Sequence, residues 1–240
     1  MAQALVPLKD LVQAKSRLAG LLRPSERRAL AQAMVEDVLA VLSRHKELSR
    51  VTLVSDDPGA GLLAARYDID YWDERSLGCS SGLNPVVGAA SARLLGDDDE
   101  PLLVLHGDLP LLTAADISAV LRCQRQLAGL VIACDLAGTG TNLLAFTPGC
   151  VPQFCFGVNS CARHLASARN TGVPAQVLQR SGIALDVDEP RDMKLLMAAL
   201  EGETSGETFD LLHGSGLGAR LELALATLDD NRNMGKGVAN

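Results

Sequence analysis

Three aspartates occur in sequence contexts that favour metal binding. Asp108 follows an apolar run in the segment HGDLP, and Asp186 and Asp188 alternate with apolar residues in LDVDEP. Residues two apart on a strand point to the same face, so we predict a strand that aims the carboxylates of Asp186 and Asp188 one way. Carboxylate oxygens suit Mg²⁺, which binds one or two of them together with substrate phosphates. If the fold brings Asp108 to this pair, the three side chains form a magnesium site.

Three cations lie near the start of the chain. Lys9, Lys15 and Arg17 have only Asp10 to offset them, although the formal net charge of the protein is -7. An ion pair at about 4 Å contributes roughly 4 kcal/mol at an effective dielectric near 20, whereas charges beyond the ~8 Å Debye length are largely screened. No glycine precedes Gly20 in this segment, so side-chain cations would replace part of a backbone phosphate cradle. Cations beside a magnesium site indicate a nucleoside triphosphate as ligand.

Each motif also has a structural interpretation. The cations could form a solvated basic turn, and Asp108 before Leu-Pro could cap a turn. Asp188 could be the N-cap of a helix that has Pro190 in its first turn. We interpret His106 and His164 as structural or peripheral residues, because no second histidine or cysteine stands at metal-ligand spacing.

Apolar runs and amphipathic segments alternate along the first 200 residues. Apolar runs predict strands at 2–8, 50–56, 69–73, 101–108, 129–135 and 143–146. Helical spacing predicts helices at 24–45, 62–67, 82–95 and 113–127, and another that begins near Ser160. Thr113 is the expected N-cap of its helix, with Asp116 completing a capping box. This alternation is typical of a mostly parallel sheet covered on both faces, whose ligands bind beyond the carboxyl ends of the strands.

Composition excludes several classes of protein. A chain of 240 residues with 48% hydrophobic and 21% charged positions is expected to be soluble and globular, with one main domain at 1–200. The acidic balance and 3% aromatic content argue against a nucleic-acid partner. The sequence has neither a membrane-length apolar run nor a secretory signal, so we expect a cytoplasmic protein without a membrane partner, whose six cysteines are reduced thiols. Residues 201–240 are expected to be a Gly/Thr-rich linker and a short tail, helical in part near 219–228, that adds little to the site.

A set of motifs in a fixed order resembles a known family. VPLKDLVQAKSRL, VSDDP, GLN, HGDLPLLT, GTGTNLL, FGVNSCARHL and LDVDEPRDM follow one another through about residues 5–195. They resemble the guanylyltransferases of deazaflavin coenzyme F-420 biosynthesis, which transfer GMP from GTP to 2-phospho-L-lactate, phosphoenolpyruvate or 3-phospho-D-glycerate. The resemblance implies a three-layer α/β/α sandwich of the nucleotidyltransferase fold, like that of nucleotide-diphospho-sugar transferases and molybdopterin-cofactor guanylyltransferases.

The resemblance also implies roles for individual residues. The catalytic residues would be Lys9, Lys15, Arg17 and Asp108, and the ligands of Mg²⁺ would be Asp108, Asp186 and Asp188. GTP would be bound by Lys9, Lys15, Ser16, Arg17, Ser55, Gly82 and Asn84, and the acceptor by Thr141, Gly157 and Ser160. One departure concerns the acceptor loop: many relatives read Phe-Gly-Pro-Gly-Ser-Phe-Ala-Arg-His where this chain has FGVNSCARH.

The implied partners are GTP and a small phosphorylated carboxylic acid, with the product passed to the next enzyme of coenzyme assembly; a homodimer is left open. A phosphomonoester is mostly dianionic at neutral pH because its second pKa is about 6, so the acceptor needs no dedicated base to attack the α-phosphorus.

Two alternative functions remain. One is another nucleotidyltransferase, of the sugar-phosphate or molybdopterin type, and the other is a non-catalytic nucleotide-binding module, which would not need three convergent carboxylates.

Overall fold

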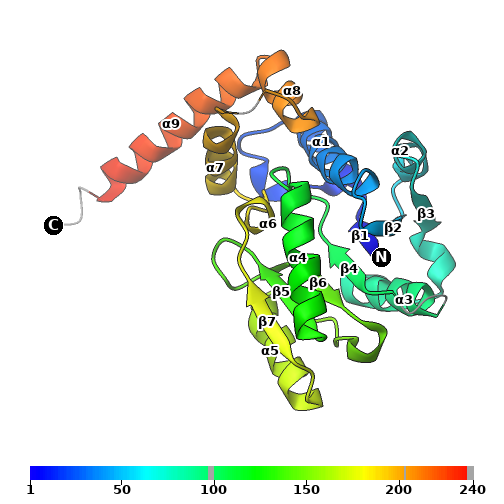
Figure 1. Ribbon diagram of the computed structural model, residues 1–240. Helices are drawn as coiled ribbons and strands as arrows, with labels where there is room; N and C mark the ends of the chain where they lie inside the picture. Colours follow the sequence, from blue (N-terminus) through cyan, green and yellow to red (C-terminus); the bar gives the residue numbers. More distant parts are fainter. Residues whose placement is uncertain (97–99, 203, 237–240) are drawn as a thin grey trace.

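A single mixed sheet forms the centre of the protein (Figure 1). The computed structural model describes residues 1–96, 100–202 and 204–236, with side chains up to residue 228. Within these residues seven strands occur in the order β3-β2-β1-β4-β6-β5-β7. They are β1 (Ala2–Leu8), β2 (Leu48–Ser55), β3 (Asp70–Asp73), β4 (Leu102–Leu105), β5 (Leu130–Cys134), β6 (Thr141–Phe146) and β7 (Ala175–Leu178). β6 is antiparallel to both its neighbours, and the other pairs are parallel, so the sheet is mostly parallel as predicted.

Helices cover both faces of the sheet. The α-helices are α1 (Pro24–Ser43), α2 (Ala60–Arg66), α3 (Leu83–Leu95), α4 (Ala114–Leu127), α5 (Ser160–Thr171), α6 (Ser181–Ala184), α7 (Pro190–Leu200), α8 (Glu207–Gly214) and α9 (Leu217–Lys236). Short 3-10 helices lie at Leu11–Gln13, Ser16–Leu18, Glu74–Leu77 and Pro148–Cys150. Helices α1, α2 and α4 pack on one face, and α3 and α5 on the other. The predicted three-layer sandwich is confirmed.

The strands are apolar on both faces because both faces are buried. In β1, Ala4 and Val6 pack with α1 and α4, whereas Leu5 between them packs with α3. β4 repeats the alternation, with Leu103 on the first side and Val104 on the second. This period of two explains why the sequence shows continuous apolar runs rather than alternating polarity.

The segment around Asp186 and Asp188 differs from its prediction. It runs between α6 and α7 and pairs with none of the seven strands found in the described residues, so the predicted strand is wrong. Leu185 and Val187 are buried against helices α1, α7 and α9, which gives the alternation of a strand without a hydrogen-bonded neighbour. The structural alternative for Asp188, that it is the N-cap of the next helix, is also wrong, since Glu189 caps α7.

The sequence correctly predicted where two other helices, α4 and α1, begin. Thr113 is the N-cap of α4 and forms a capping box with Asp116, as predicted. Helix α1 begins at Pro24, as predicted, and ends at Ser43, two residues earlier than the predicted end. Both helices start with a recognisable N-terminal signal, which fixes the start better than the end.

Residues 201–240 contain more helix than the predicted linker and tail. Helix α8 contacts α1, and α9 extends beyond it toward the C-terminus (Figure 1). Leu217, Leu221 and Leu225 of α9 are buried in an apolar cluster with Leu18 and Leu22 of the first loop, which we call the loop cluster. The domain division at residue 200 stays a prediction, and residues 203 and 237–240 lie outside the described part of the chain.

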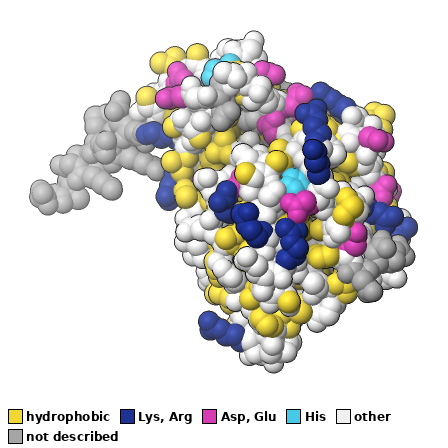
Figure 2. Space-filling model, viewed as in Figure 1, with side chains coloured by type: hydrophobic (Ala, Val, Ile, Leu, Met, Phe, Trp, Pro, Cys, Tyr) yellow, Lys and Arg dark blue, Asp and Glu magenta, His cyan; other side chains and the backbone are white. Residues whose placement is uncertain are grey.

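The face over α4 carries side chains of both charges, interspersed with apolar ones (Figure 2). None of the helices among the described residues is both long and apolar enough to cross a membrane. All six cysteines are free thiols, as expected.

Candidate functional site

Lys15 lies between two of the predicted metal ligands. Its ammonium donates hydrogen bonds to Asp108 Oδ2 at 2.5 Å and to Asp188 Oδ1 at 2.9 Å. The side chain is only 6% exposed, so this contact is not a surface ion pair. Lys15 has left-handed backbone angles, φ 55° and ψ 39°, which are unfavourable for a residue with a Cβ. The loop accepts this conformation where it directs the lysine at the carboxylates, and local strain of this kind is concentrated at functional sites.

The charges in this cluster change one another's pKa. Burial alone would lower the pKa of Lys15, but the carboxylates of Asp108 and Asp188 raise it to about 12. Burial would raise the pKa of Asp108, yet Lys15 and then His106 hold it below its usual value. Lys15 is therefore a cation and Asp108 an anion at neutral pH.

Asp186 lies near this pair, where its surroundings disfavour the ionised carboxylate. Its Oδ1 accepts a hydrogen bond from Asn142 Nδ2 at 3.1 Å. Burial and the charge of Asp108 raise the pKa of Asp186, and the bond from Asn142 only partly opposes this. The ionised form of Asp186 is thus electrostatically unfavourable and would gain from a nearby cation.

A register shift at the start of β6 directs Asn142 to Asp186. Ala133 pairs with Leu143, and Cys134 pairs with Thr141, so Asn142 is the extra residue of a β-bulge. Its side chain also donates to the carbonyl of Ile183 in α6 at 2.8 Å. Bulges are frequent beside active sites because they re-aim side chains.

Asp108 has an unused oxygen. Oδ1 is buried and has no hydrogen-bond partner in the described part of the chain, although Oδ2 is bound to Lys15. A buried carboxylate oxygen without a partner is costly and calls for a cation or donor. Within the described residues no group of three His, Cys, Asp or Glu side chains is arranged to hold a metal ion. The ammonium of Lys15 instead pairs with both Asp108 and Asp188.

Asp57 holds the first loop in place, a role that sequence analysis missed. This buried carboxylate accepts from the backbone N–H of Leu11 at 2.9 Å and of Gly59 at 2.7 Å. Ser55 Oγ in turn accepts from the N–H of Asp57 at 3.0 Å. Ser55 is fully buried, so its hydroxyl supports the loop, and its contact with GTP stays a prediction. The paired acids in VSDDP were the available signal for this anchor.

The other predicted cations are accessible. Lys9 is exposed and lines a cavity of about 340 Å³ together with Lys15, His106 and Asp108. Arg17 and Ser16 are on the neighbouring 3-10 helix, where Arg17 is exposed and pairs with Glu189 at 3.2 Å. The cavity is therefore lined by two lysines, Lys9 and Lys15, and by the carboxylates of Asp108 and Asp188.

Asn84, a predicted GTP contact, is hydrogen-bonded to the predicted acceptor loop. It lies in the first turn of α3, just after the exposed Gly82, which is the N-cap with φ 115°. Its Oδ1 accepts from the N–H of Phe156 at 2.8 Å, and its Nδ2 donates to the carbonyl of Phe156 at 3.2 Å. Asn84 thus fixes the acceptor loop, and its predicted contact with GTP stays a prediction.

The predicted acceptor residues meet at the start of α5. Gly157 is exposed with φ 113°, and Asn159 has the left-handed angles φ 55° and ψ 34°. Asn159 is the N-cap of α5, so Ser160 is buried in the first turn and is not the cap. Thr141 reaches the same helix through a hydrogen bond to His164. Asparagine tolerates the left-handed region best after glycine, which explains how this altered loop keeps its turn.

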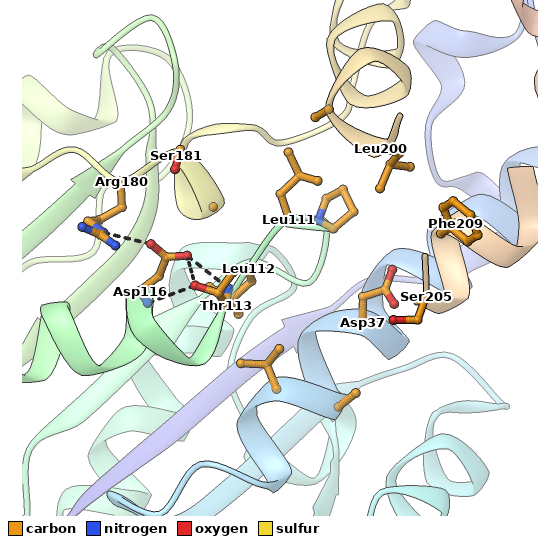
Figure 3. A pocket seen from close by; sticks show the side chains of 16 residues that line it. Asp37, Leu111, Leu112, Thr113, Asp116, Arg180, Ser181, Leu200, Ser205 and Phe209 are labelled. Atoms are coloured by element: carbon orange, nitrogen blue, oxygen red, sulfur yellow. Dashed lines mark hydrogen bonds and ion pairs between the residues drawn. The ribbon is translucent and has the colours of Figure 1, made fainter. Parts of the chain in front are cut away.

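A larger cavity, of about 490 Å³, lies near the C-terminal half of α1 and is lined by none of the predicted site residues (Figure 3). Its carboxylates already have partners. Asp116 bonds with Thr113 and with Arg180 at 2.8 Å, and Asp37 accepts from the N–H groups of Glu207 and Thr208. Asp116 thus caps the start of α4, and Asp37 caps the start of α8.

Comparison with known proteins places the sequence in one family. Residues 2–215 match the family described as "Guanylyl transferase CofC like". A phosphoenolpyruvate guanylyltransferase of Conexibacter woesei is 39% identical over 206 residues, covering 85% of this chain and 90% of the relative. One from Sphaerobacter thermophilus is 36% identical and covers 85% and 97%. A 3-phospho-D-glycerate guanylyltransferase of Phenylobacterium zucineum is 34% identical and covers 80% and 88%.

Solved structures agree on the fold. A protein of Desulfovibrio desulfuricans G20 described as a nucleotide-diphospho-sugar transferase has a TM-score of 0.76 at 16% identity, covering 93% of this chain and 99% of that one. A 4-diphosphocytidyl-2C-methyl-D-erythritol synthase has a TM-score of 0.58 at 14% identity, covering 83% and 99%. These likenesses confirm the predicted nucleotidyltransferase fold. With the family match over most of its length, the chain belongs to the CofC-like guanylyltransferase family.

Proposed function

We propose that this protein transfers GMP from GTP to the phosphate of a small phosphorylated carboxylic acid and releases pyrophosphate, in deazaflavin coenzyme F-420 biosynthesis. The observation that carries the proposal is the contact of the buried Lys15 ammonium with Asp108 and Asp188, in a cavity that Lys9 also lines. Phosphoenolpyruvate is the first candidate acceptor, because it is the substrate in the names of the relatives from Conexibacter and Sphaerobacter.

The reaction needs charge stabilisation more than acid–base chemistry. A phosphate oxygen of the acceptor attacks the α-phosphorus of GTP, and the bond from that phosphorus to the bridging oxygen breaks, so that the electron pair leaves with pyrophosphate. The acceptor is already an anion at neutral pH and loses no proton in this step. Lys15 would neutralise charge on the triphosphate, and the exposed Lys9 and Arg17 would bind its outer phosphates.

Asp108 and Asp186 have the chemistry that a magnesium ion needs, although no three carboxylates among the described residues are arranged around one point. Asp108 offers a buried, unpartnered oxygen, and the raised pKa of Asp186 is that of a carboxylate that would gain from a cation. Asp108 and Asp186 would hold the ion, with Asp188 as a third ligand once Lys15 turns to the phosphates. Bound there, Mg²⁺ would neutralise the charge that develops on the phosphates during transfer.

The test is a pyrophosphate-release assay with purified protein, Mg²⁺ and a panel of substrates. GTP is combined in turn with phosphoenolpyruvate, 3-phospho-D-glycerate and 2-phospho-L-lactate, and ATP and CTP are the nucleotide controls. We expect release that requires both GTP and one phospho-acid. Release that is independent of every phospho-acid, or none with any of the three, would overturn the proposal.

A further inference from the structure

His164 is a fully buried side chain that uses both of its ring nitrogens. Its Nε2 accepts a hydrogen bond from the backbone N–H of Cys155 at 2.9 Å. Its Nδ1 lies 3.1 Å from the hydroxyl oxygen of Thr141. The ring also packs edge-on against Phe156, with 5.2 Å between centroids. One imidazole therefore joins the acceptor loop to the first residue of β6.

These contacts fix the tautomer of the ring. Nε2 accepts from a backbone N–H, which can only donate, so Nε2 carries no proton. Burial, followed by the charge of Arg163, lowers the pKa of His164 to about 4, so the ring is neutral at physiological pH. The single ring proton must then be on Nδ1, where it is donated to Thr141.

The tautomer determines what Thr141 can offer a ligand. A hydroxyl that accepts from Nδ1–H cannot donate to that nitrogen, so its own proton is free to point elsewhere. The opposite tautomer would draw the hydroxyl proton to the ring and leave oxygen lone pairs for the ligand, which repel an anion. The β-bulge at Asn142 contributes by placing Thr141 on the α5 side of the sheet.

We propose that His164 is a positioning residue of the acceptor site, which holds the hydroxyl of Thr141 as a hydrogen-bond donor to the anionic phospho-acid. The inference rests on the proposed function, because it needs an anion as the acceptor. It assigns no chemical step to His164, whose side chain is fully buried. His164 thus favours an anionic ligand indirectly, through the orientation of the Thr141 hydroxyl.

Two substitutions separate the functions of the two ring nitrogens. In His164→Gln the amide reaches the place of Nε2, so it can still accept from Cys155 but cannot reach Thr141. In His164→Asn the shorter amide lies at the place of Nδ1 and can donate to Thr141. We expect His164→Gln to raise the KM for the phospho-acid about tenfold, which is about 1.4 kcal/mol, because a hydrogen bond to a charged group is weakened. The KM for GTP should stay unchanged. His164→Asn should recover most of the loss.

A double-mutant comparison identifies Thr141 as the residue through which His164 acts. Thr141→Val removes the hydroxyl, so adding His164→Gln to it should cause no further rise in the KM for the phospho-acid. Additive effects, or an unchanged acceptor KM in folded His164→Gln, would overturn the inference. If wild-type protein turns over none of the three phospho-acids, the proposed function fails and the inference falls with it.

The tautomer itself can be measured without any activity. A long-range ¹H–¹⁵N spectrum of the wild-type protein should show His164 protonated on Nδ1 alone, with shifts that stay constant between about pH 6 and pH 8. This measurement tests the inference even if His164→Gln does not fold. A proton on Nε2 would overturn the inference.

Discussion

At the scale of single residues, the site is a balance between a buried lysine and three carboxylates with different surroundings. Lys15 stabilises Asp108 as an anion, and that anion in turn makes ionisation of Asp186 less favourable. The predicted magnesium site depended on whether the fold brings Asp108 to Asp186 and Asp188, and Lys15 contacts both Asp108 and Asp188. It could not show that Lys15 would occupy the space between two of them, which depends on a left-handed backbone conformation.

Asp186→Asn should make the protein more stable at neutral pH while reducing turnover. The pKa of Asp186 is raised in the folded state, so its ionised form costs stability above that pKa, and the cost disappears as the pH falls through it toward the unfolded value. The amide keeps the oxygen that accepts from Asn142. Thermal unfolding of both proteins across the acidic to neutral range should show a Tm advantage for Asp186→Asn that shrinks on acidification.

Asp108→Asn is the matched control and should act in the opposite direction. The pKa of Asp108 is lowered in the folded state, so its ionised form contributes stability at neutral pH that is lost as the pH falls through the folded pKa. The substitution also removes one of the two carboxylates bound to Lys15. A lower Tm in Asp186→Asn than in Asp108→Asn at neutral pH would contradict this account of the cluster.

At the scale of elements, three local features position the site: the strained first loop, the β-bulge of β6 and the left-handed cap of α5. The sequence predicted most strands and helices, since buried strands are apolar runs and N-terminal caps are recognisable. It did not predict the bulge at Asn142, because a register shift depends on pairing between distant residues. For the same reason, the alternation of Leu185 and Val187 was interpreted as a strand when it reflects packing against helices.

Asn159 should tolerate glycine but not alanine. Its φ of 55° costs roughly 1–2 kcal/mol for most residues with a Cβ, whereas glycine adopts it freely. We expect Asn159→Gly to change the free energy of unfolding by less than about 0.5 kcal/mol and Asn159→Ala to lower it by about 1 kcal/mol. Asn170→Ala, an exposed position within the same helix, is the control and should be neutral or slightly stabilising. Equal Tm values for Asn159→Gly and Asn159→Ala would argue against a strained cap.

At the scale of the whole molecule, the loop that carries Lys15 follows the central strand β1 and packs against the C-terminal helix α9. The loop cluster packs Leu18 and Leu22 against α9, and Arg220 of α9 donates to the carbonyl of Leu21 at 3.0 Å. The tail therefore supports the loop that carries Lys15, contrary to the expectation that it adds little. The composition of residues 201–240 could not reveal this, because apolar positions of α9 are spaced among polar ones over a short segment.

Leu221→Ala should destabilise the protein and weaken its use of GTP. Leu221 is fully buried in the loop cluster, and truncating such a leucine typically costs about 2–5 kcal/mol. Leu223→Ala on the same helix is the control, because Leu223 is 73% exposed and its loss should cost less than about 0.5 kcal/mol. Chemical denaturation and the KM for GTP measure the two effects. Equal stability of both variants would remove α9 from the support of the loop.

Identification of the product tests the central claim most directly. Wild-type protein is incubated with Mg²⁺, GTP and phosphoenolpyruvate, and the mixture is followed by ³¹P NMR, with Asp108→Asn in parallel. We predict equal amounts of pyrophosphate and of a new compound in which two coupled phosphorus atoms join GMP to the phospho-acid, and neither product with Asp108→Asn. Formation of GDP and inorganic phosphate, or the new compound at wild-type rate with Asp108→Asn, would contradict the account.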